Sequence, residues 1–468
     1  MKLEYIYHIT PIKEKTYLHV YIHTNLKEHS NFLKSYHLTK SNVDTKIINN
    51  GNRLMIHYFD KNLKYFSIKE LVTALSNVKD DLIIDLTHLE NPNDKLMMAQ
   101  LICKGLYTFE KYKTKNPKEQ RQRHICFYDH KRNQALMKDI IHQIYVTNMN
   151  RDFQNEPANI INPKSFCDYV KKKVIKNQKN IKVKVFDEKD LKAMGLNMIE
   201  QMGKASIHKS RFLVLEYMSQ VQSNQIETFA IVGKGVCFDS GGLNIKTDSY
   251  MDPAMKADKT GGTTAVSVVL YAAQAKLKCN VIALVPLIEN IISGDALHPG
   301  DIVKTYNKKT VEIIDTDAEG RVIMTDALAY TSNYPKITYL FDLATLTGQA
   351  ETFVPDTTSV HFTLNKQLSS LIEDLGEKIG ERTLALPAHA EYTKATFSDV
   401  ADYKNYDFGS FNRTGTYMAS VYLLNFVPKH LRKSYVHFDI TNSFPKTISN
   451  GNVTILILSL IKYIIKNK

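Results

Sequence analysis

The chain has 468 residues, 43% hydrophobic and 23% charged, a composition that fits a globular protein and excludes a disordered or fibrous one. This length is too great for one ordinary core and predicts two domains. The 61 Lys and Arg outnumber the 48 Asp and Glu, so the formal net charge is +13, and the surplus is greatest in the N-terminal third.

The N-terminal third combines strand-like and helical patterns. Leu82–Leu86 and His124–Tyr128 are short apolar runs bounded by polar residues, as buried strands are. Residues 94–107, between them, carry apolar side chains at helical spacing. The order strand, helix, strand predicts a small α/β domain. We expect this domain to have an oligomeric or regulatory role.

A polar stretch with two prolines, residues 148–163, follows this region. Such a composition is typical of a loop between domains. We therefore expect an N-terminal domain over residues 1–150 and a larger C-terminal domain over residues 151–468.

The N-terminal third also contains a basic stretch, Lys111–Arg123. It could attract nucleic acid electrostatically, but a solvated loop is the interpretation we favour. No aromatic residue is interleaved through residues 113–123, so a platform for stacking single-stranded bases is not indicated.

The cysteines and the apolar segments bear on cellular location. The five cysteines are odd in number and form no CxxC pair, so we expect free thiols and a cytoplasmic protein. Glu4 and His8 interrupt the first apolar residues, so we expect no signal peptide. The apolar stretch Val453–Ile465 is shorter than the roughly 20 residues that span a membrane, and we expect a buried strand running into a helix there.

After residue 163 the pattern becomes strongly α/β. The runs that read as buried strands are Phe229–Val232, Asn280–Leu287, Val311–Ile314, Ile337–Leu343 and Val436–Ile440. The helical stretches are Thr263–Ala275, Arg321–Ser332, Gln367–Lys378 and Tyr417–Phe426. Strands that are apolar along their length, with helices between them, predict a mostly parallel central sheet covered by helices.

Two segments concentrate carboxylates and glycines directly after predicted strands. One runs from Val232 to Lys246 and is followed by Met255-Lys-Ala-Asp258, and the other is Asp315–Arg321. Ligands of open α/β sheets bind outside the carboxyl ends of the strands, where both segments are expected. The carboxylates concerned are Asp239, Asp258, Asp317 and Glu319.

If crowded together, these carboxylates would repel one another, and burial would raise their pKa values. Divalent cations remove the repulsion, because carboxylates bridge metal ions about 3.5–4 Å apart. Such cations would also depress the pKa of a nearby lysine and let it act as a ligand or an electrophile. Each motif alone is more often a turn or a solvated loop, so the prediction depends on their joint occurrence.

The motifs VGKGVCFDSGGLNIK, MKAD and DTDAEGR, in this order, resemble the signature of the leucyl aminopeptidases, a family of hexameric exopeptidases with two metal ions. The resemblance extends over the C-terminal two thirds of the chain. Further matching segments are EPANIINP at 156–163, ALHPGDIV at 296–303, ATLTG at 344–348, ERTLALP at 381–387, ADYKN at 401–405 and VHFDI at 436–440.

The resemblance implies a metal-dependent aminopeptidase that hydrolyses the N-terminal peptide bond of peptides and prefers Leu-like apolar residues. Lys234, Asp239, Asp258 and Glu319 match the ligands of one metal ion. The ligands of the other match Asp239, Asp317 and Glu319, so Asp239 and Glu319 would bridge the two. The ions would be Zn²⁺ or Mn²⁺, with Co²⁺ or Mg²⁺ also compatible with these ligands.

The resemblance also implies the remaining roles. Lys246 matches the lysine that polarises the scissile carbonyl for attack by a metal-bridging water. Arg321 matches the arginine that holds a bicarbonate ion, the proton shuttle. Met255, Thr345 and Gly348 match positions near the pocket for the N-terminal side chain. A homohexamer is implied by the resemblance alone.

The chain departs from the family pattern near the site. Asp315 stands where the family usually has Asn, and Lys259 replaces an apolar residue after Asp258. Thr247 replaces a common Pro, and the loop from Asp239 to Asp258 carries one extra residue. Cys237 reads as a core thiol and His298 as a loop residue, so neither is expected in catalysis.

Two alternatives stay open from the sequence. One is a protein on the same fold that binds DNA, with weak or no peptidase activity, because some members of the family bind DNA and the N-terminal third is basic. The other is an inactive enzyme used as a structural hexamer. The complete set of ligand residues favours the peptidase, since a binding protein has no chemical need of it.

Overall fold

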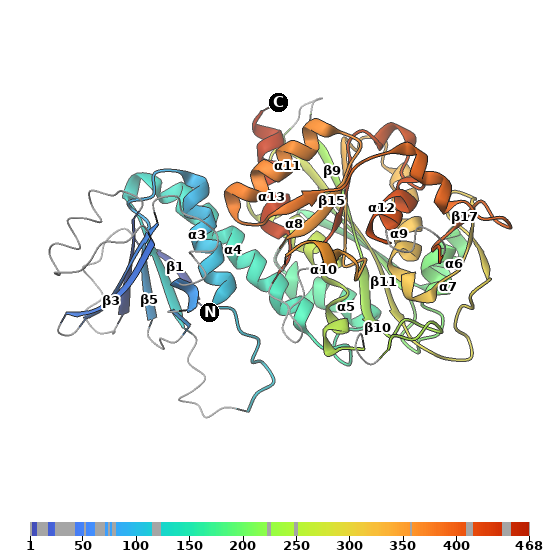
Figure 1. Cartoon of the computed structure of the whole chain (residues 1–468), viewed down its shortest axis with the longest axis horizontal. Helices are drawn as coiled ribbons and strands as arrows, with labels where there is room; N and C mark the ends of the chain where they lie inside the picture. The colour runs from blue at the N-terminus through green and yellow to red at the C-terminus, as the bar shows by residue number, and fades with distance from the viewer. Residues whose placement is uncertain are drawn as a thin grey trace. The chain divides into compact units, whose positions relative to one another are not determined.

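The computed structural model (Figure 1) forms two compact units, Met1–Asn148 with Lys378–Gly380, and Met149–Glu377 with Glu381–Lys468. The described residues are 2–6, 17–23, 43–50, 53–60, 71–73, 75–76, 81–114, 123–221, 226–247, 251–355, 358–408, 415–441 and 451–467. Most of the basic stretch Lys111–Arg123, namely residues 115–122, lies outside the described residues.

The first unit is built on a six-stranded sheet in the order β1-β6-β5-β2-β4-β3. All neighbours are parallel except β3 and β4, which are antiparallel. The strands are β1 (Lys2–Ile6), β2 (Tyr17–His23), β3 (Val43–Asn50), β4 (Arg53–Asp60), β5 (Asp81–Asp85) and β6 (His124–Tyr128). The predicted strands at 82–86 and 124–128 are confirmed.

Helix α3 (Pro92–Gly105) confirms the helix predicted between these strands. Asn91 caps it by accepting a hydrogen bond from the Asn93 amide, and Pro92 occupies the first turn, where its missing N–H is not needed. The helix carries a buried ion pair. Lys95 Nζ lies 2.7 Å from Asp129 Oδ2 and donates to the Leu86 carbonyl at 2.7 Å. This single lysine and single carboxylate join α3 to the ends of β5 and β6.

The expected loop at 148–163 is wrong over its first half, because helix α4 (Gln134–Asn155) continues to Asn155. Two polar side chains there, those of Asn150 and Gln154, are buried and form hydrogen bonds. Asn150 Nδ2 donates to the hydroxyls of Thr264 and Thr454, and Gln154 Nε2 donates to the Gly451 carbonyl. Helix α5 (Pro163–Tyr169) then begins at a capping box formed by Asn162 and Ser165.

The second unit contains a nine-stranded sheet in the order β16-β15-β18-β14-β9-β11-β8-β7, with β10 also paired to β11. Strands β18, β14, β9, β11 and β10 are parallel, whereas β8, β7 and β15 add antiparallel pairs. The strands are β7 (Ile181–Phe186), β8 (Arg211–Tyr217), β9 (Thr228–Gly233), β10 (Gly235–Asp239), β11 (Asn280–Asn290), β14 (Tyr339–Ala344), β15 (Ser359–Phe362), β16 (Thr383–Ala385) and β18 (Tyr435–Asp439). The mostly parallel central sheet is confirmed.

Helices cover both faces of this sheet (Figure 1). Ala230 and Val232 of β9 pack in one core cluster with α9 (Glu319–Tyr330), α7 (Asn197–Met202) and α12 (Gly415–Leu424). Alternation along the strand turns Ile231 to the other face, where α8 (Thr260–Gln274) packs against β9, β11 and β14. The remaining helices are α6 (Glu188–Met194), α10 (Ala350–Phe353), α11 (Lys366–Ile379) and α13 (Thr454–Lys466).

Two further expectations need correction. The stretch Val453–Ile465 is α13 almost throughout, so the strand expected at its start is wrong. The run at 311–314 contributes β13 (Thr310–Glu312) to a separate three-stranded sheet with β12 (Ile302–Lys304) and β17 (Tyr403–Lys404). Within the described residues, no helix is long and apolar enough to cross a membrane.

Candidate metal centre

The two carboxylate-rich segments meet at the carboxyl ends of β9 and β10. Lys234 follows β9, and Asp239 ends β10. Asp258 closes the 3₁₀ turn Pro253–Ala257, Asp317 lies in the 3₁₀ turn Thr316–Ala318, and Glu319 opens α9. This is the crevice that the topology of open parallel sheets provides for ligands.

Glycines allow this crowding. A Cβ at Gly233 would come within 2.4 Å of the Gly261 carbonyl oxygen, so the first turn of α8 could not approach the end of β9. Gly241 has φ +87°. A Cβ on it would lie 2.9 Å from Asp317 Oδ1. These two positions require glycine, for close approach and for a left-handed backbone respectively.

Three buried carboxylates form the centre of the cluster. Oxygen atoms of Asp239, Asp258 and Glu319 all lie within 4.8 Å of one another. Their residues are 2%, 4% and 1% exposed. Negative charges this close and this poorly solvated require cations to compensate them.

Lys234 supplies one compensating charge. Its Nζ lies 2.8 Å from Asp258 Oδ1 and 2.8 Å from Glu319 Oε1, and it donates to the Thr345 carbonyl at 2.7 Å. Burial by itself would lower the pKa of Lys234, but Asp258, Glu319 and Asp239 outweigh burial and hold the pKa above its ordinary value.

Lys246 supplies the second charge. Its Nζ lies 2.8 Å from Asp239 Oδ2 and 2.5 Å from Asp317 Oδ1. Here too burial acts to lower the pKa, and the carboxylates of Asp239, Glu319 and Asp317 raise it overall. The structure therefore brings all five predicted metal ligands and Lys246 together.

Four carboxylates face two lysines in this cluster, and the pKa values of three of the carboxylates are raised. Burial, followed by neighbouring carboxylates, raises the pKa of Asp317 to about 7. The pKa values of Asp258 and Glu319 are raised in the same way, chiefly by burial. Asp258 Oδ2 is buried and has no hydrogen-bond partner among the described residues. Four carboxylates with an unpartnered oxygen fit divalent cations, which prefer oxygen ligands, with Lys234 as a nitrogen donor.

Residues that the sequence reading missed hold these ligands in place. Asn290 Nδ2 donates to Asp239 Oδ1 at 2.8 Å and to the Thr316 carbonyl at 3.0 Å. The Thr316 hydroxyl donates to the Gly241 carbonyl at 2.7 Å, and its amide donates to Asn244 Oδ1 at 2.9 Å. These bonds tie the two motif segments to each other. A lone Asn or Thr gives no charge or spacing signal by which sequence reasoning could have found it.

Arg321 lies in the first turn of α9 and is 4% exposed. Its Nη1 donates to the Asn405 carbonyl at 3.0 Å, and the Tyr406 ring centre is 5.5 Å from its Cζ. Its Nε has no hydrogen-bond partner among the described residues. Burial lowers the pKa of the guanidinium from its ordinary value. A buried guanidinium with an unused N–H is suited to binding an anion.

The three predicted pocket residues are placed differently. The Thr345 hydroxyl donates to Asp258 Oδ1 at 2.6 Å, so Thr345 borders the carboxylate cluster. Met255 is partly buried in the 3₁₀ turn that Asp258 closes, and its carbonyl accepts from the Asp258 amide at 3.4 Å. Gly348 is exposed, and a Cβ there would meet no described atom within 4 Å.

The two charged departures from the family pattern have clear surroundings. Asp315 Oδ1 accepts from the Asp317 amide at 2.8 Å and so caps the turn that carries Asp317. Lys259 is fully buried, and burial lowers its pKa to about 8. Its Nζ donates to the carbonyls of Gln154 at 3.1 Å and Glu156 at 2.8 Å, and to that of Lys256. Lys259 thus binds backbone near the end of α4.

The two residues expected outside catalysis lie where they were predicted. Cys237 is fully buried, and the other four free cysteines are also buried. The His298 side chain is 64% exposed in its loop.

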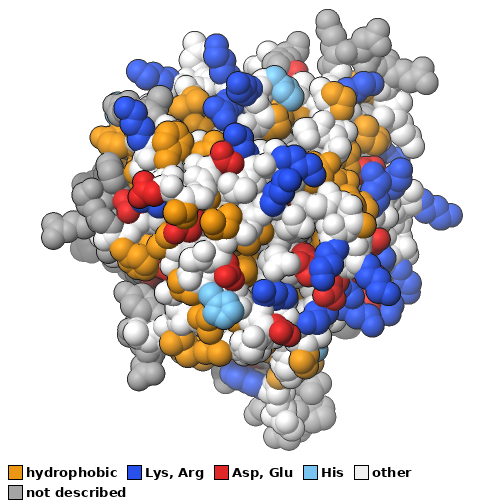
Figure 2. Space-filling view, turned by 90° about the vertical axis from the view of Figure 1, so that its right-hand side faces the viewer, with side chains coloured by type: hydrophobic (Ala, Val, Ile, Leu, Met, Phe, Trp, Pro, Cys, Tyr) orange, Lys and Arg blue, Asp and Glu red, His pale blue; other side chains and the backbone are white. Residues whose placement is uncertain are grey.

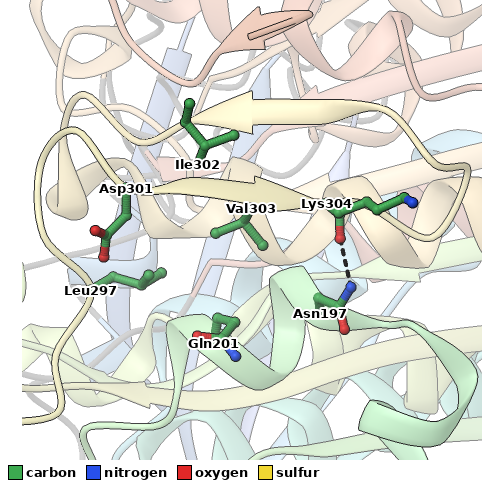
Figure 3. Close-up of a pocket in the computed structure, with 7 residues that line it drawn as sticks. All are labelled: Asn197, Gln201, Leu297, Asp301, Ile302, Val303 and Lys304. Atoms are coloured by element: carbon green, nitrogen blue, oxygen red, sulfur yellow. Dashed lines mark hydrogen bonds between the residues drawn. The ribbon is translucent and has the colours of Figure 1, made fainter. Parts of the chain in front are cut away.

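A surface hollow of about 360 Å³ lies between α7 and β12 (Figure 3), and its lining includes none of the predicted site residues. Asn197 Nδ2 donates to the Lys304 carbonyl across it. Its other lining residues are Gln201, Leu297, Asp301, Ile302 and Val303. Asp301 and Lys304 are the charged residues that line it, so it does not share the chemistry of the carboxylate cluster.

The face shown in Figure 2 carries Lys and Arg side chains with Asp and Glu among them.

Comparison with known proteins agrees with this geometry. A model of the cytosol aminopeptidase family, catalytic domain, matches residues 148–454. The probable cytosol aminopeptidase of Chloroherpeton thalassium is 37% identical over 304 residues, which cover 65% of this chain and 58% of that protein. That of Clostridium perfringens is 32% identical over 350 residues, covering 73% of this chain and 69% of that protein. The match with the first of these relatives thus spans less than two thirds of that protein's length.

Solved structures share the fold. The bottromycin maturation enzyme BotP superposes with a TM-score of 0.80 at 22% identity, and the alignment covers 96% of this chain and 100% of that one. BotP in complex with Mn gives a TM-score of 0.79, also at 22% identity, over 96% of this chain and 99% of that one.

Proposed function

The chain belongs to the cytosol aminopeptidase family, and on that premise we propose that it is a metal-dependent aminopeptidase that releases N-terminal residues from peptides. One observation carries the proposal. Asp239, Asp258 and Glu319 are buried within 4.8 Å of one another at the carboxyl ends of the sheet, beside two lysines. A fold has no structural need for such an excess of buried carboxylates.

We assign the ligands as follows. Lys234, Asp239, Asp258 and Glu319 would hold one divalent cation, and Asp239, Asp317 and Glu319 would hold the other. Zn²⁺ and Mn²⁺ suit this mixture of carboxylates and one amine, and Co²⁺ or Mg²⁺ could replace them. A bound pair of cations would polarise a peptide carbonyl and generate a nucleophile from water at neutral pH.

The chain's own residues would do the rest. Lys246, on the open side of the cluster with 12% of its side chain exposed, would stabilise negative charge developing on the carbonyl oxygen. Arg321 would hold bicarbonate through its unused N–H, and the bound anion would accept and return a proton. Glu319 lies in the first turn of α9, where the positive end of the helix dipole favours its ionised form against the opposing effect of burial.

Specificity would come from the residues around Asp258. Met255 and Thr345 border the cluster and, with Gly348, would accept a Leu-like apolar side chain. The absence of a side chain at Gly348 leaves open space for it. We further propose that the protein works in the cytoplasm as a homohexamer, as the family resemblance implies.

The test is hydrolysis of leucine-p-nitroanilide by the purified chain, first after chelation and then with Mn²⁺ or Zn²⁺ restored. Activity that disappears on chelation and returns with metal supports the proposal. A folded, metal-bound protein that stays inactive with each cation contradicts it.

A further inference from the structure

Asn405 is a buried residue next to the site that has no role in the assignments above. It is 1% exposed and follows strand β17. Strands β13 and β17 pair in parallel, with Glu312 opposite Lys404, and the Asn405 amide extends this pairing by donating to the Glu312 carbonyl at 3.1 Å. The backbone pairing of β13 and β17 ends at this residue. Beyond it, the Asn405 side chain forms the hydrogen bonds to the segment that follows β13.

The Asn405 side chain binds the backbone of the two residues before the Asp317 turn. Its Oδ1 accepts from the amides of Ile314 at 2.7 Å and Asp315 at 3.2 Å. Its Nδ2 donates to the Asp315 carbonyl at 2.6 Å. An amide side chain carries its acceptor and its donor on two separate atoms and does so without charge at every pH. This one side chain therefore helps to fix the path of the chain into Asp317, just before the segment that Asn290 and Asn244 hold.

The backbone of the same residue binds the catalytic arginine. The Asn405 carbonyl accepts from Arg321 Nη1 at 3.0 Å. The next residue, Tyr406, places its ring 5.5 Å from the Arg321 guanidinium, where a cation–π contact is favourable. Asn405 and Tyr406 thus fix the guanidinium from one side and leave its Nε unused.

We infer that Asn405 is a positioning residue that couples the placement of Arg321 to the placement of the segment carrying Asp317. The inference rests on the proposed function for the roles of Arg321 and Asp317. Asn405 touches neither the three buried carboxylates nor a reacting group in its described contacts. It acts by holding two parts of the site in one geometry, as outer residues around metal sites do.

Asn405→Ala removes the amide and leaves the backbone carbonyl. We expect hydrogen exchange at the amides of Ile314 and Asp315 to quicken at least about tenfold, since their acceptor is lost. We expect Mn²⁺ affinity and kcat to fall about 10- to 100-fold, with a smaller change in KM for leucine-p-nitroanilide.

Asp402→Ala is the matched control. Asp402 Oδ2 accepts from the Thr310 amide at 2.9 Å, so it fastens the other end of the same strand pair and contacts neither Arg321 nor residues 314–315 in its described bonds. This variant should keep kcat and Mn²⁺ affinity within about twofold of the parent, as surface changes away from a site usually do. An equal loss in Asp402→Ala would mean that β17 as a whole matters, and would overturn the inference.

Asn405→Asp keeps the shape and serves if the alanine variant does not fold. Its ionised carboxylate would face the Asp315 carbonyl, whereas its protonated form offers an O–H donor there. The ratio of its kcat to that of the parent should therefore rise as pH falls, and a flat ratio counts against the inference.

The measurements separate this inference from the proposed function. If the parent hydrolyses no aminoacyl anilide, the proposed function fails. Hydrogen exchange and Mn²⁺ binding then still test whether Asn405 positions the segment that carries Asp317. Unchanged exchange and unchanged Mn²⁺ affinity in Asn405→Ala would overturn the inference even in a fully active enzyme.

Discussion

Each unit of the molecule buries lysine beside carboxylate, but the charges balance in only one of them. In the N-terminal unit, Lys95 meets Asp129 at 2.7 Å, with the two side chains 2% and 0% exposed. The remaining capacity of Asp129 is used by the His130 amide and Asn133 Nδ2. One positive and one negative charge, with hydrogen bonds completing both, form a structural ion pair.

In the second unit, two lysines face four carboxylates. Lys234 and Lys246 pair with Asp239, Asp258, Asp317 and Glu319, and Asp258 Oδ2 remains without a described partner. The comparison shows that burial of ionised groups is not by itself a sign of function. The unbalanced carboxylates mark the site, because buried negative charge that the two lysines do not compensate favours the binding of further cations.

The largest expected effect comes from removing a carboxylate that would bridge two cations. Glu319→Ala should bring hydrolysis of leucine-p-nitroanilide down to the background of the assay, because both cations lose a ligand. Glu377→Ala, an exposed carboxylate on α11 paired with Arg382, should leave activity unchanged. Substantial turnover in Glu319→Ala would show that the excess carboxylates have another purpose.

The balanced pair should matter for stability. Lys95→Met leaves Asp129 buried without its cation and should lower the free energy of unfolding by about 3–5 kcal/mol in urea titrations. Lys113→Met breaks the exposed pair with Glu110, in which the lysine side chain is 67% exposed. This variant should change the free energy of unfolding by less than about 1 kcal/mol. Equal effects in the two variants would remove the distinction between the buried and the exposed pair.

Lys246 tests whether a lysine in the unbalanced cluster is a catalyst. Lys246→Ala should lower kcat/KM about 10²- to 10³-fold, as loss of one group that stabilises an oxyanion does. Elemental analysis after dialysis against Mn²⁺ should find the parental metal content. If Lys246→Ala lost its metals, the assigned role of Lys246 would be wrong.

The smallest effect concerns the chelated protein and pH. The pKa of Asp317 is raised to about 7, so its ionised form opposes folding. This cost is absent below about pH 4, where the carboxyl is protonated in both states, and is complete above about pH 7. Asp317→Asn removes the charge that opposes folding. It should therefore stabilise the chelated protein by about 1 kcal/mol at pH 8 and not at pH 4, as changes that remove unfavourable charges from functional sites often do.

Asp374→Asn, on the exposed side of α11, provides the control for this prediction. Urea titrations of this variant at both pH values give the effect of removing one exposed carboxylate outside the site. If Asp317→Asn showed no more pH dependence than this control, the excess of charge at the site would have no measurable cost.

Much of the fold was accessible from the sequence, because strands such as β9 and β11 are apolar along their whole length. The errors have physical causes. The end of α4 is polar in composition and was predicted as a loop, yet Asn150 and Gln154 find buried partners in distant segments. Tertiary hydrogen bonds of this kind override local composition. The stretch 453–465 is rich in Ile and Leu, and its periodicity does not separate a buried strand from a buried helix.

The site also contains residues that the sequence predicted and residues that it could not predict. Its carboxylates were predicted from ordered motifs, and Lys234 was implied by the family resemblance. The structure brings Lys234, Asp239, Asp258, Asp317 and Glu319 together. Asn290 and Asn405 could not be predicted, since an uncharged amide acts through contacts that only the fold creates. The sequence alone could not show what the departures Asp315 and Lys259 do. In the fold, Asp315 accepts from the Asp317 amide and Lys259 donates to backbone carbonyls.

The most direct test of the central claim is the number of Mn²⁺ ions held per chain after chelation and dialysis, in the parent and in Glu319→Ala. The account predicts about two ions in the parent and fewer in the variant, with activity following the metal content. A parent that holds no Mn²⁺ or Zn²⁺, or a variant that holds as much as the parent, would contradict the claim that these carboxylates form a cation site.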